Sequence, residues 1–243
     1  MADLADRLTL APFRSRSFTV EHKPDLSEVT EIDRDAETAI RNHLSALRPD
    51  DAVLGEEHGA EAGRSAWRWI IDPIDGTANY VRGVPIWATL VAAEHEGVLQ
   101  VGLVSAPALG RRWWATRSGG AFVDGRSMHV SAVTRLADAH LSYTNVGDFY
   151  DYGRGDQLVA LSRQVWRARG LGDFWMHMLV AEGAFDIACE PVVNLWDVAA
   201  IQLIVEEAGG RFTDLSGVAR PDGGDALSTN GHLHDEVLAI LAG

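Results

Sequence analysis

Two carboxylates stand at the end of an apolar run in the segment WIIDPIDGT, residues 69–77. The run predicts a strand, and Pro73 holds the preceding Asp72 in an extended conformation. Gly76 then permits the sharp turn that must precede a new helix, which we expect over residues 77–81. The carboxylates of Asp72 and Asp75 are therefore expected to converge at one point beyond the strand, although two such acids could also merely cap a turn.

Clustered carboxylates of this kind suit a hard divalent cation. Mg²⁺ prefers several oxygen ligands and keeps open positions for water and phosphate, and no cysteine or paired histidine stands beside these acids. The expected helix start adds the backbone N–H groups of Gly76 and Thr77, which would face an anion. The segment predicts metal-assisted chemistry on a phosphate group.

Three further acidic clusters are weaker signals on their own. The first is the Gly-Glu-Glu sequence at residues 55–57, which contains Glu56. The second is Asp33, at the start of a helical pattern. The third is Asp197, which follows Asn194 at the start of another helical pattern. Adjacent acids are usually a solvated loop, and an acid that precedes a helix is usually its N-cap. Asp33 and Asp197 are therefore both N-cap candidates, and only their combination with residues 69–77 favours a function.

Composition excludes several classes of protein. The chain has 243 residues with 35 acidic and 21 basic side chains, a net charge of −14, and no basic run that would attract nucleic acid. The single cysteine, Cys189, excludes an intrachain disulfide and a cysteine-built metal site, and it is expected to be a small core residue. No apolar stretch approaches the roughly 18 residues of a membrane span. We expect a cytoplasmic protein with no nucleic-acid or membrane partner.

The helices and strands that must position these residues form two regions with different patterns. Apolar residues spaced at i, i+3, i+4 and i+8 predict a helix over 33–47, and sequential strands with hairpin-length gaps predict an antiparallel sheet after it. These strands are expected at 67–71, 87–94, 98–105, 113–116 and 121–123. Beyond about Ser131, helices are expected at 155–167, 175–182 and 195–207, with short strands near 139–142, 185–188 and 211–213.

We therefore expect an α+β fold with two subdomains. Residues 1–130 would form an N-terminal α+β subdomain that carries most of the metal ligands. Residues 131–243 would form a smaller mixed α/β subdomain with Asp197 and the residues that select the substrate. A cleft between the two is the expected site.

Taken in order and spacing, the four acidic clusters resemble the inositol monophosphatase superfamily of metal-dependent, lithium-sensitive phosphatases. The pattern is Gly-Glu-Glu at 55–57, Asp-Pro-Ile-Asp-Gly-Thr at 72–77, Trp-Asp at 196–197 and Glu-Ala-Gly-Gly at 207–210. The resemblance covers about residues 22–240 and implies a layered αβαβα sandwich. The N-terminus departs from the pattern, because the family usually carries a longer first helix than residues 1–10 allow.

The resemblance implies a role for each acid and two to three Mg²⁺ ions. Glu56, Asp72 and the backbone carbonyl of Ile74 would hold the first ion, which also binds the attacking water. Asp72 would bridge to a second ion, completed by Asp75 and Asp197. This would be a two-metal clamp, with ions about 3.5 to 4 Å apart, that stabilises the attacking and leaving oxygens of an in-line displacement.

The water-activating residues follow from the same resemblance. Asp33 would reach a weaker third ion through water, and Asp33 with Thr77 would orient or deprotonate the nucleophile, beside the ion held by Glu56. The N–H groups of Gly76 and Thr77 remain the expected phosphate donors. The resemblance also suggests a homodimer acting on a small phosphorylated metabolite.

Substrate choice depends on side chains beyond the phosphate. Glu190 matches the acid that inositol phosphatases use on a ring hydroxyl, and Asp173 stands where those enzymes generally carry a small residue. Two acids suit a cationic leaving group such as histidinol, with Asn194 beside them, better than a neutral polyol. Asp173 could instead be a plain helix cap.

Several local phrases resemble the histidinol-phosphatase branch of the superfamily. They are weak singly and distinctive as a set: KPDL at 23–26 with Val29-Thr30, VRGVP at 81–85, SAP at 105–107, RRWWA at 111–115 and Asn230-Gly231 followed by LHDE at 233–236. The sequence therefore favours a Mg²⁺-dependent phosphomonoesterase that converts L-histidinol phosphate to L-histidinol and phosphate. An inositol or small sugar phosphate phosphatase is the alternative, and an inactive metal-binding regulator on the same fold is a third.

Overall fold

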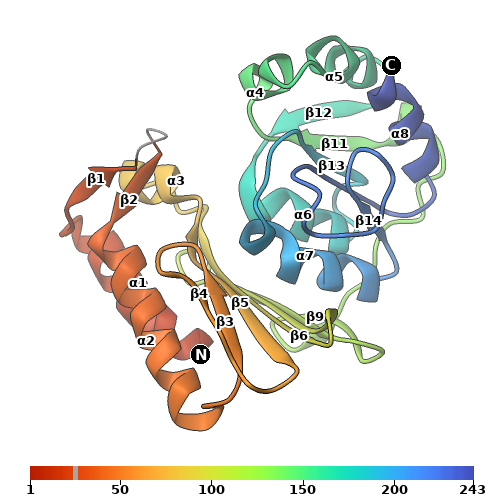
Figure 1. Cartoon of the computed structure of the whole chain (residues 1–243). Helices are drawn as coiled ribbons and strands as arrows, with labels where there is room; N and C mark the ends of the chain where they lie inside the picture. Colours follow the sequence, from red (N-terminus) through yellow and green to blue (C-terminus); the bar gives the residue numbers. More distant parts are fainter. Residues whose placement is uncertain (24–26) are drawn as a thin grey trace.

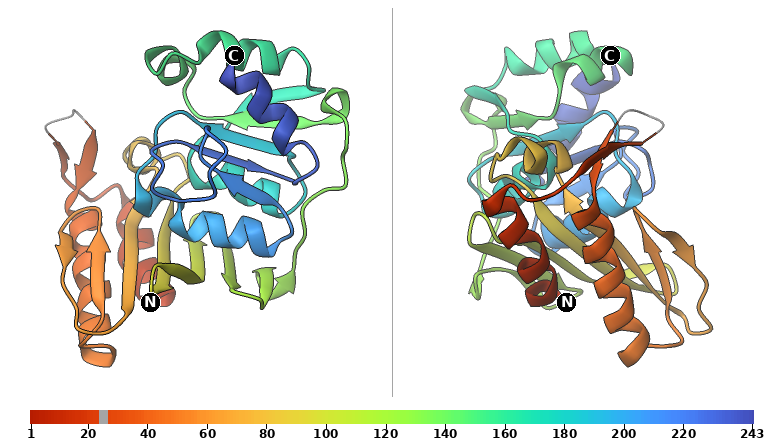
Figure 2. Two further views of the ribbon diagram at one scale, coloured as in Figure 1. Left: turned by 45° about the vertical axis from the view of Figure 1, so that its right-hand side comes forward. Right: turned by 90° about the vertical axis from the view of Figure 1, so that its left-hand side faces the viewer.

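The computed structural model describes residues 1–23 and 27–243 and shows alternating layers of helices and sheets (Figure 1). Helices α1 (Ala2–Ser15) and α2 (Glu31–Leu47) cover one face of a large sheet. Helices α6 (Asp173–Ala181) and α7 (Leu195–Glu207) lie between that sheet and a smaller one. Helices α4 (Val146–Asp151), α5 (Gly155–Ser162) and α8 (His234–Ala242) cover the far face of the smaller sheet. This is the expected αβαβα sandwich, seen from two further sides in Figure 2.

The larger sheet has eight strands in the order β10-β9-β8-β7-β6-β5-β3-β4. Neighbouring strands are antiparallel except β3 and β5, which run parallel. The strands are β3 (Ala52–Gly55), β4 (Gly59–Glu61), β5 (Trp67–Asp75), β6 (Ala88–His95), β7 (Val98–Ala106), β8 (Arg111–Thr116), β9 (Gly120–Val123) and β10 (Arg126–Ser127). The expected antiparallel sheet is confirmed, with β3 as the parallel addition.

The smaller sheet has five strands in the order β12-β11-β13-β15-β14. They are β11 (His140–Tyr143), β12 (Arg167–Gly170), β13 (Ile187–Glu190), β14 (Arg211–Thr213) and β15 (Ala226–Thr229). A separate hairpin of β1 (Val20–His22) and β2 (Glu28–Thr30) leads into α2, and the short helix α3 (Thr77–Arg82) follows β5. A 3-10 turn covers Leu136–Asp138.

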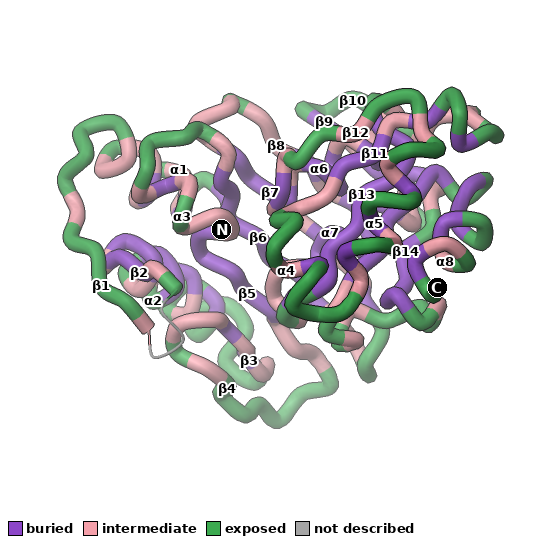
Figure 3. The backbone as a smooth tube through the Cα atoms, turned by 90° about the horizontal axis from the view of Figure 1, so that it is seen from above, coloured by how far each residue is buried: buried purple, intermediate pink, exposed green. Residues whose placement is uncertain are grey.

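The outer helix α2 and the middle-layer helix α7 differ in how much of their surface is buried. Helix α2 buries one stripe, which includes Ile32, Ala36, Ile40 and Leu44, against the large sheet. Helix α7 instead is buried continuously from Val198 to Val205, because it packs against strands of both sheets. Figure 3 shows the same contrast, with α7 and the central strands buried and the periphery exposed.

Several boundaries differ from the sequence-based expectation, and those of three helices are described here. The helix expected over 155–167 ends at Ser162, and Arg167 begins strand β12. The first helix extends beyond residue 10 to Ser15 and contains Pro12. Helix α2 begins at Glu31 rather than at Asp33, because Thr30 is its N-cap.

Residues 24–26 of the KPDL segment lie outside the described residues.

The burial of the single cysteine also agrees with the sequence-based expectation. Cys189 is fully buried, as expected of a core residue. In residues 1–23 and 27–243, none of the helices combines the length and apolar character that crossing a membrane would take.

His234 is buried at the junction of the small sheet and α8, and it gives the first testable prediction. Its ring nitrogens lie 2.9 Å from Thr213 Oγ1 and 2.9 Å from Thr229 Oγ1. Burial, together with the charge of Arg211, lowers the pKa of His234 to about 4, although Asp235 opposes this. The folded pKa is thus below the unfolded value of about 6.5, so the unfolded chain binds the proton first.

We therefore expect His234 to reduce the free energy of unfolding progressively as pH falls from about 6.5 to 4, by up to about 3 kcal/mol. Urea unfolding of the wild type and of His234→Gln at pH 7 and pH 4.5 measures this contribution. The stability loss between the two pH values should be smaller in the variant. Equal losses in the two proteins would contradict the assignment.

Candidate functional site

The carboxylates of Asp72 and Asp75 meet because strand β5 is irregular at its end. Residues three apart on a regular strand point to opposite faces. In the pairing of β5 with β6, however, Asp72 lies opposite Leu90 and Asp75 opposite Ala88, so β5 contains one extra residue here. Such a bulge re-aims the side chains that follow it. The strand thereby brings both acids to one side.

Asp197 joins them from the first turn of α7. It is the third helical residue, and its Oδ2 accepts a hydrogen bond of 2.7 Å from the backbone N–H of the N-cap, Asn194. Carboxylate oxygens of Asp72, Asp75 and Asp197 all lie within 4.8 Å of one another. The N-cap expectation for Asp197 was therefore wrong by one turn, while the expected convergence of the three acids is present.

The loop that carries Glu56 is held by a buried acid of α2. Glu37 is fully buried, and its Oε2 accepts a hydrogen bond of 2.7 Å from the backbone N–H of Glu57. Arg41 Nε balances the charge of Glu37 from 2.7 Å. A Cβ at Gly55 would lie only 2.1 Å from Glu37 Oε1, so the glycine of the Gly-Glu-Glu step is required by this close approach.

Lys23 contacts Glu56 and Glu57 at the same time. Its Nζ lies 2.7 Å from an oxygen of each. Although burial alone would lower the pKa of the Lys23 ammonium, the hydrogen bonds that it donates to these two acids raise it. The only lysine of the chain therefore carries its charge beside an expected metal ligand.

Asp33 and Thr77 are brought together across the α2–α3 contact. Asp33 Oδ2 accepts hydrogen bonds from the N-cap Thr30, 2.9 Å from its backbone nitrogen and 2.6 Å from its hydroxyl. The hydroxyl of Thr77 lies 3.1 Å from Asp33 Oδ1 and 2.9 Å from the carbonyl oxygen of Ile74. Asp33 is thus the third residue of its helix and not the N-cap, and its second oxygen is paired with Thr77.

The electrostatics of this cluster call for cations. Burial and the charges of Glu56, Asp75 and Asp197 raise the pKa of Asp72 well above its usual range. Burial also raises the pKa of Asp75, and it raises that of Asp197 to about 7. Asp72 Oδ1 is buried and has no hydrogen-bond partner among the described residues. The carboxylates therefore fit a divalent cation, which would supply both the missing partner and the opposing charge.

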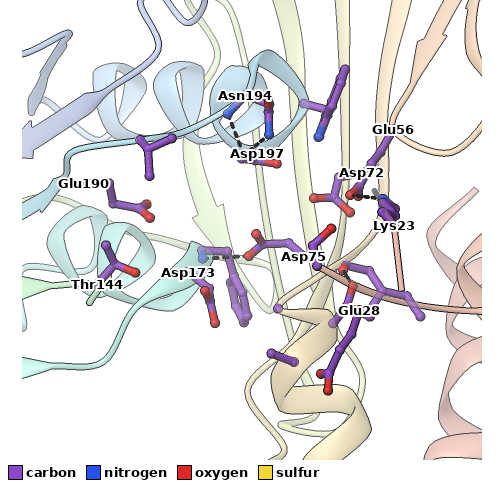
Figure 4. Close-up of a pocket in the computed structure, with 18 of the residues that line it drawn as sticks. Lys23, Glu28, Glu56, Asp72, Asp75, Thr144, Asp173, Glu190, Asn194 and Asp197 are labelled. Atoms are coloured by element: carbon purple, nitrogen blue, oxygen red, sulfur yellow. Dashed lines mark hydrogen bonds and ion pairs between the residues drawn. The ribbon is translucent and has the colours of Figure 1, made fainter. Parts of the chain in front are cut away.

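The cluster lines a cavity of about 790 Å³ between the two sheets. Figure 4 shows Glu56 and Lys23 at one end, Asp72, Asp75 and Asp197 in the middle, and Glu190 and Asp173 at the other end. The two acids expected to select the substrate are therefore together, on the far side of the acidic cluster from Glu56.

Asp173 reaches the cavity from the first residue of α6. Its Oδ2 accepts a hydrogen bond of 2.8 Å from Asn79 Nδ2 of α3. Burial and the charge of Glu190 raise the pKa of Asp173 to about 7. Gly76 has φ of 82°, and a Cβ there would lie 3.1 Å from Asp173 Oδ2, so the glycine permits both the turn and the approach of Asp173.

The segment after Asp173 also ties the two halves of the site together. The backbone N–H of Phe174 donates a hydrogen bond of 2.8 Å to Asp75 Oδ2. Asp173 and one ligand of the cluster are thereby fixed relative to each other. A simple helix-cap function does not account for these contacts, which link α6 to the end of β5.

Glu190 ends strand β13, and a histidine holds it. His177 Nε2 lies 2.8 Å from Glu190 Oε1. Asn194, the third residue expected to bind the substrate, is the N-cap of α7 and also lines this cavity. Every residue expected at the site lines the cavity or contacts a residue that does.

The sequence analysis missed three residues that form hydrogen bonds to the acids of the site or to the loop that carries one of them. These are Glu37, Asn79 and His177. Neither Asn79 nor His177 carried a local signal, because their partners, Asp173 and Glu190, lie 94 and 13 residues away in the sequence. Glu37 has the spacing of a helical ion pair with Arg41, but its hydrogen bond to the loop at Glu57 spans 20 residues and could not be predicted.

Comparison with known proteins agrees with this geometry. A profile described as the inositol monophosphatase family matches residues 5–242. The histidinol-phosphatase of Streptomyces coelicolor is 52% identical over 99% of this chain and 94% of its own length. That of Mycobacterium tuberculosis is 51% identical over 99% and 95%. The solved structure of Thermotoga maritima IMPase superposes with a TM-score of 0.90 at 33% identity, covering 99% of this chain and 94% of that one.

Asp72 supplies the second testable prediction. Asp72→Asn removes the central charge of the cluster, so turnover in saturating Mg²⁺ should fall by about 100-fold or more, because a neutral amide is a weaker ligand. In chelator, the same variant should melt about 2 °C or more above the wild type, because a costly buried repulsion is relieved. Steady-state kinetics and thermal melts with and without Mg²⁺ measure both effects.

Asp225→Asn is the matched control. Burial also raises the pKa of Asp225, but this residue does not line the cavity and accepts a hydrogen bond from the backbone of Leu215. Its replacement should leave turnover within about twofold of wild type. If Asp72→Asn kept more than a tenth of wild-type turnover, Asp72 would not be a metal ligand.

Proposed function

Because the chain belongs to the inositol monophosphatase family and is a phosphomonoesterase, we propose that it hydrolyses L-histidinol phosphate to L-histidinol and inorganic phosphate. Water is the nucleophile. Its oxygen bonds to phosphorus as the bond from phosphorus to the histidinol oxygen breaks. One proton leaves the water, and one is returned to the departing alkoxide.

The observation that carries this proposal is the pair of acids at the far end of the cavity. Histidinol has an ammonium group and an imidazole, and its phosphate is at the opposite end of the molecule. Asp173 and Glu190 are placed to accept charge-assisted hydrogen bonds from the cationic end. A neutral polyol would leave these two buried acids without an opposing charge, at a cost in free energy.

The similar proteins support the same substrate. The two relatives reported above are named histidinol-phosphatase, and both are about half identical to this chain over nearly its whole length. The solved IMPase structure supports the phosphatase fold but is less similar in sequence. The names of these relatives and the chemistry of the cavity thus favour histidinol phosphate over the other substrates of the family.

The metal ligands we propose are all oxygen donors. Glu56, Asp72 and the carbonyl of Ile74 would hold one ion, and Asp72 would share a second with Asp75 and Asp197. Asp33 would reach a third ion through water. Bound Mg²⁺ would stabilise the charge that develops on the attacking and leaving oxygens. The absence of sulfur and paired imidazole ligands from this set favours Mg²⁺ over softer metals.

The chain's own residues would prepare the water. Thr77 has its hydroxyl between Asp33 and the carbonyl of Ile74, so it can orient a water that Asp33 deprotonates. Burial raises the pKa of Asp33, and a raised pKa makes a carboxylate a better general base. The N–H groups of Gly76 and Thr77 would donate to the phosphate.

The setting of the reaction completes the proposal. A homodimer follows from the family resemblance, and a cytoplasmic location suits a chain whose one cysteine is a buried free thiol.

A substrate panel tests the function. Phosphate release should be compared on histidinol phosphate, inositol 1-phosphate, fructose 1,6-bisphosphate and p-nitrophenyl phosphate under one set of Mg²⁺ conditions. We expect kcat/KM to be highest on histidinol phosphate. A higher kcat/KM on inositol 1-phosphate would overturn the proposal and assign the enzyme to the polyol phosphatases.

Charge removal at the acidic pair is the third testable prediction. Glu190→Gln and Asp173→Asn should each weaken histidinol phosphate by about 1.5 to 3 kcal/mol in kcat/KM, the usual effect of losing a hydrogen bond to a charged group. Neither should alter p-nitrophenyl phosphate hydrolysis appreciably, because that ester has no cationic end. An equal fall on both substrates would show that the acids serve the metals or the fold.

A further inference from the structure

His177 lies behind Glu190 and is completely buried. It is on α6, four residues after Asp173. Its Nε2 lies 2.8 Å from Glu190 Oε1, and its Nδ1 lies 2.7 Å from Ser228 Oγ. Figure 4 shows the Glu190 carboxylate directed into the cavity in front of it.

The hydrogen-bond partners determine the most favourable proton arrangement. A carboxylate only accepts, so His177 must donate from Nε2–H to Glu190. In the neutral ring Nδ1 is then an acceptor, and the hydroxyl of Ser228 donates to it. Hydrogen bonds thus run in one direction, from Ser228 through His177 to Glu190.

The small sheet fixes both ends of this chain of hydrogen bonds. Ser228 is on β15 and Glu190 is on β13, which pair antiparallel with Ala188 opposite Ser228 and Glu190 opposite Ala226. Because the two strands hold their register, the distance between Ser228 and Glu190 is set by the backbone. His177 spans it with both ring nitrogens satisfied.

We propose that His177 is a positioning residue for substrate selection: it holds one oxygen of Glu190 so that the other faces the cationic end of the substrate. This inference rests on the proposed histidinol phosphate activity. Glu190 needs such support because Asp173 repels it across the cavity. The hydrogen bond from His177 stabilises the charged, inward-facing carboxylate and opposes its rotation away from its neighbour.

The fourth testable prediction uses His177→Leu, which removes both hydrogen bonds. We expect KM for histidinol phosphate to rise about tenfold or more while kcat changes less than about threefold. On p-nitrophenyl phosphate, kcat and KM should stay near wild type. The dissociation constant of L-histidinol, measured by calorimetry, should rise in parallel, because this ligand has the cationic end but no phosphate.

Two further variants separate positioning from packing. His177→Gln places an amide donor near the position of Nε2 and should recover most of the affinity. Ser228→Ala removes only the distal hydrogen bond and should raise KM for histidinol phosphate in the same direction by a smaller factor. These two variants also keep the test decisive if His177→Leu does not fold.

His234→Leu is the matched control. His234 is also fully buried with both ring nitrogens satisfied, by Thr213 and Thr229, but it does not line the cavity. The His234→Leu substitution should lower the melting temperature and leave the ratio of the KM values for histidinol phosphate and p-nitrophenyl phosphate unchanged. A purely structural His177 would behave in the same way.

The outcomes distinguish this inference from the proposed function. If Glu190→Gln weakens only histidinol phosphate and the His177 variants do not, the positioning function of His177 is wrong and the substrate stands. If the His177 variants lower activity equally on both substrates, His177 is structural. If the wild type prefers another substrate, both proposals fail.

Discussion

Mutual repulsion among buried carboxylates is the constraint on which the site depends. Asp72, Asp75 and Asp197 have oxygens within 4.8 Å of one another, and burial and like charges raise the pKa of all three. Such a cluster would relax if its side chains could turn away. The surrounding fold prevents this, because the cluster joins the end of a strand in the large sheet to the start of the helix between the sheets. The free energy stored in the repulsion is recovered when cations bind.

The sequence predicted the cluster through local signals. An apolar run, a proline, a glycine and two acids lie within nine residues, and these fixed the strand, the turn and the short helix that follows. The αβαβα layers were predicted from the resemblance to the inositol monophosphatase superfamily. The spacing of the strands by itself predicted only an antiparallel sheet followed by a mixed α/β part. The division at about residue 130 stays a prediction, as do the individual ligand roles.

The parts that could not be predicted depend on contacts between distant residues. No sequence rule indicates that β5 bulges between Asp72 and Asp75, since the extra residue exists only relative to β6. From the sequence alone, Asp33 and Asp197 were N-cap candidates, because an acid near a helix start usually caps it. In both helices the cap is the polar residue three positions earlier, Thr30 or Asn194, and the acid bonds back to it. Pairing Asp33 with Thr30 would have corrected the start of α2, whereas the start of α7 was already predicted at Leu195.

These capping interactions reveal how the site holds its acids without neutralising them. One oxygen of Asp33 accepts from Thr30, and one of Asp197 accepts from Asn194. The same arrangement holds at the other end of the cavity, where Asp173 accepts from Asn79. All three donors are uncharged, so they restrict the side chain while leaving the full charge for a cation.

Glu56 is held in a different way, and the difference has a consequence for metal binding. Its partner, Lys23, is a cation, and the same ammonium also bonds to Glu57. A divalent ion that coordinates Glu56 must therefore compete with the ammonium for that carboxylate or share it at a cost in repulsion. Asp72, Asp75 and Asp197 have no cationic partner in the described chain, so their charge is available without such competition. In the ligand arrangement proposed above, an ion at Glu56 would therefore meet a competition that an ion held by Asp75 and Asp197 would not.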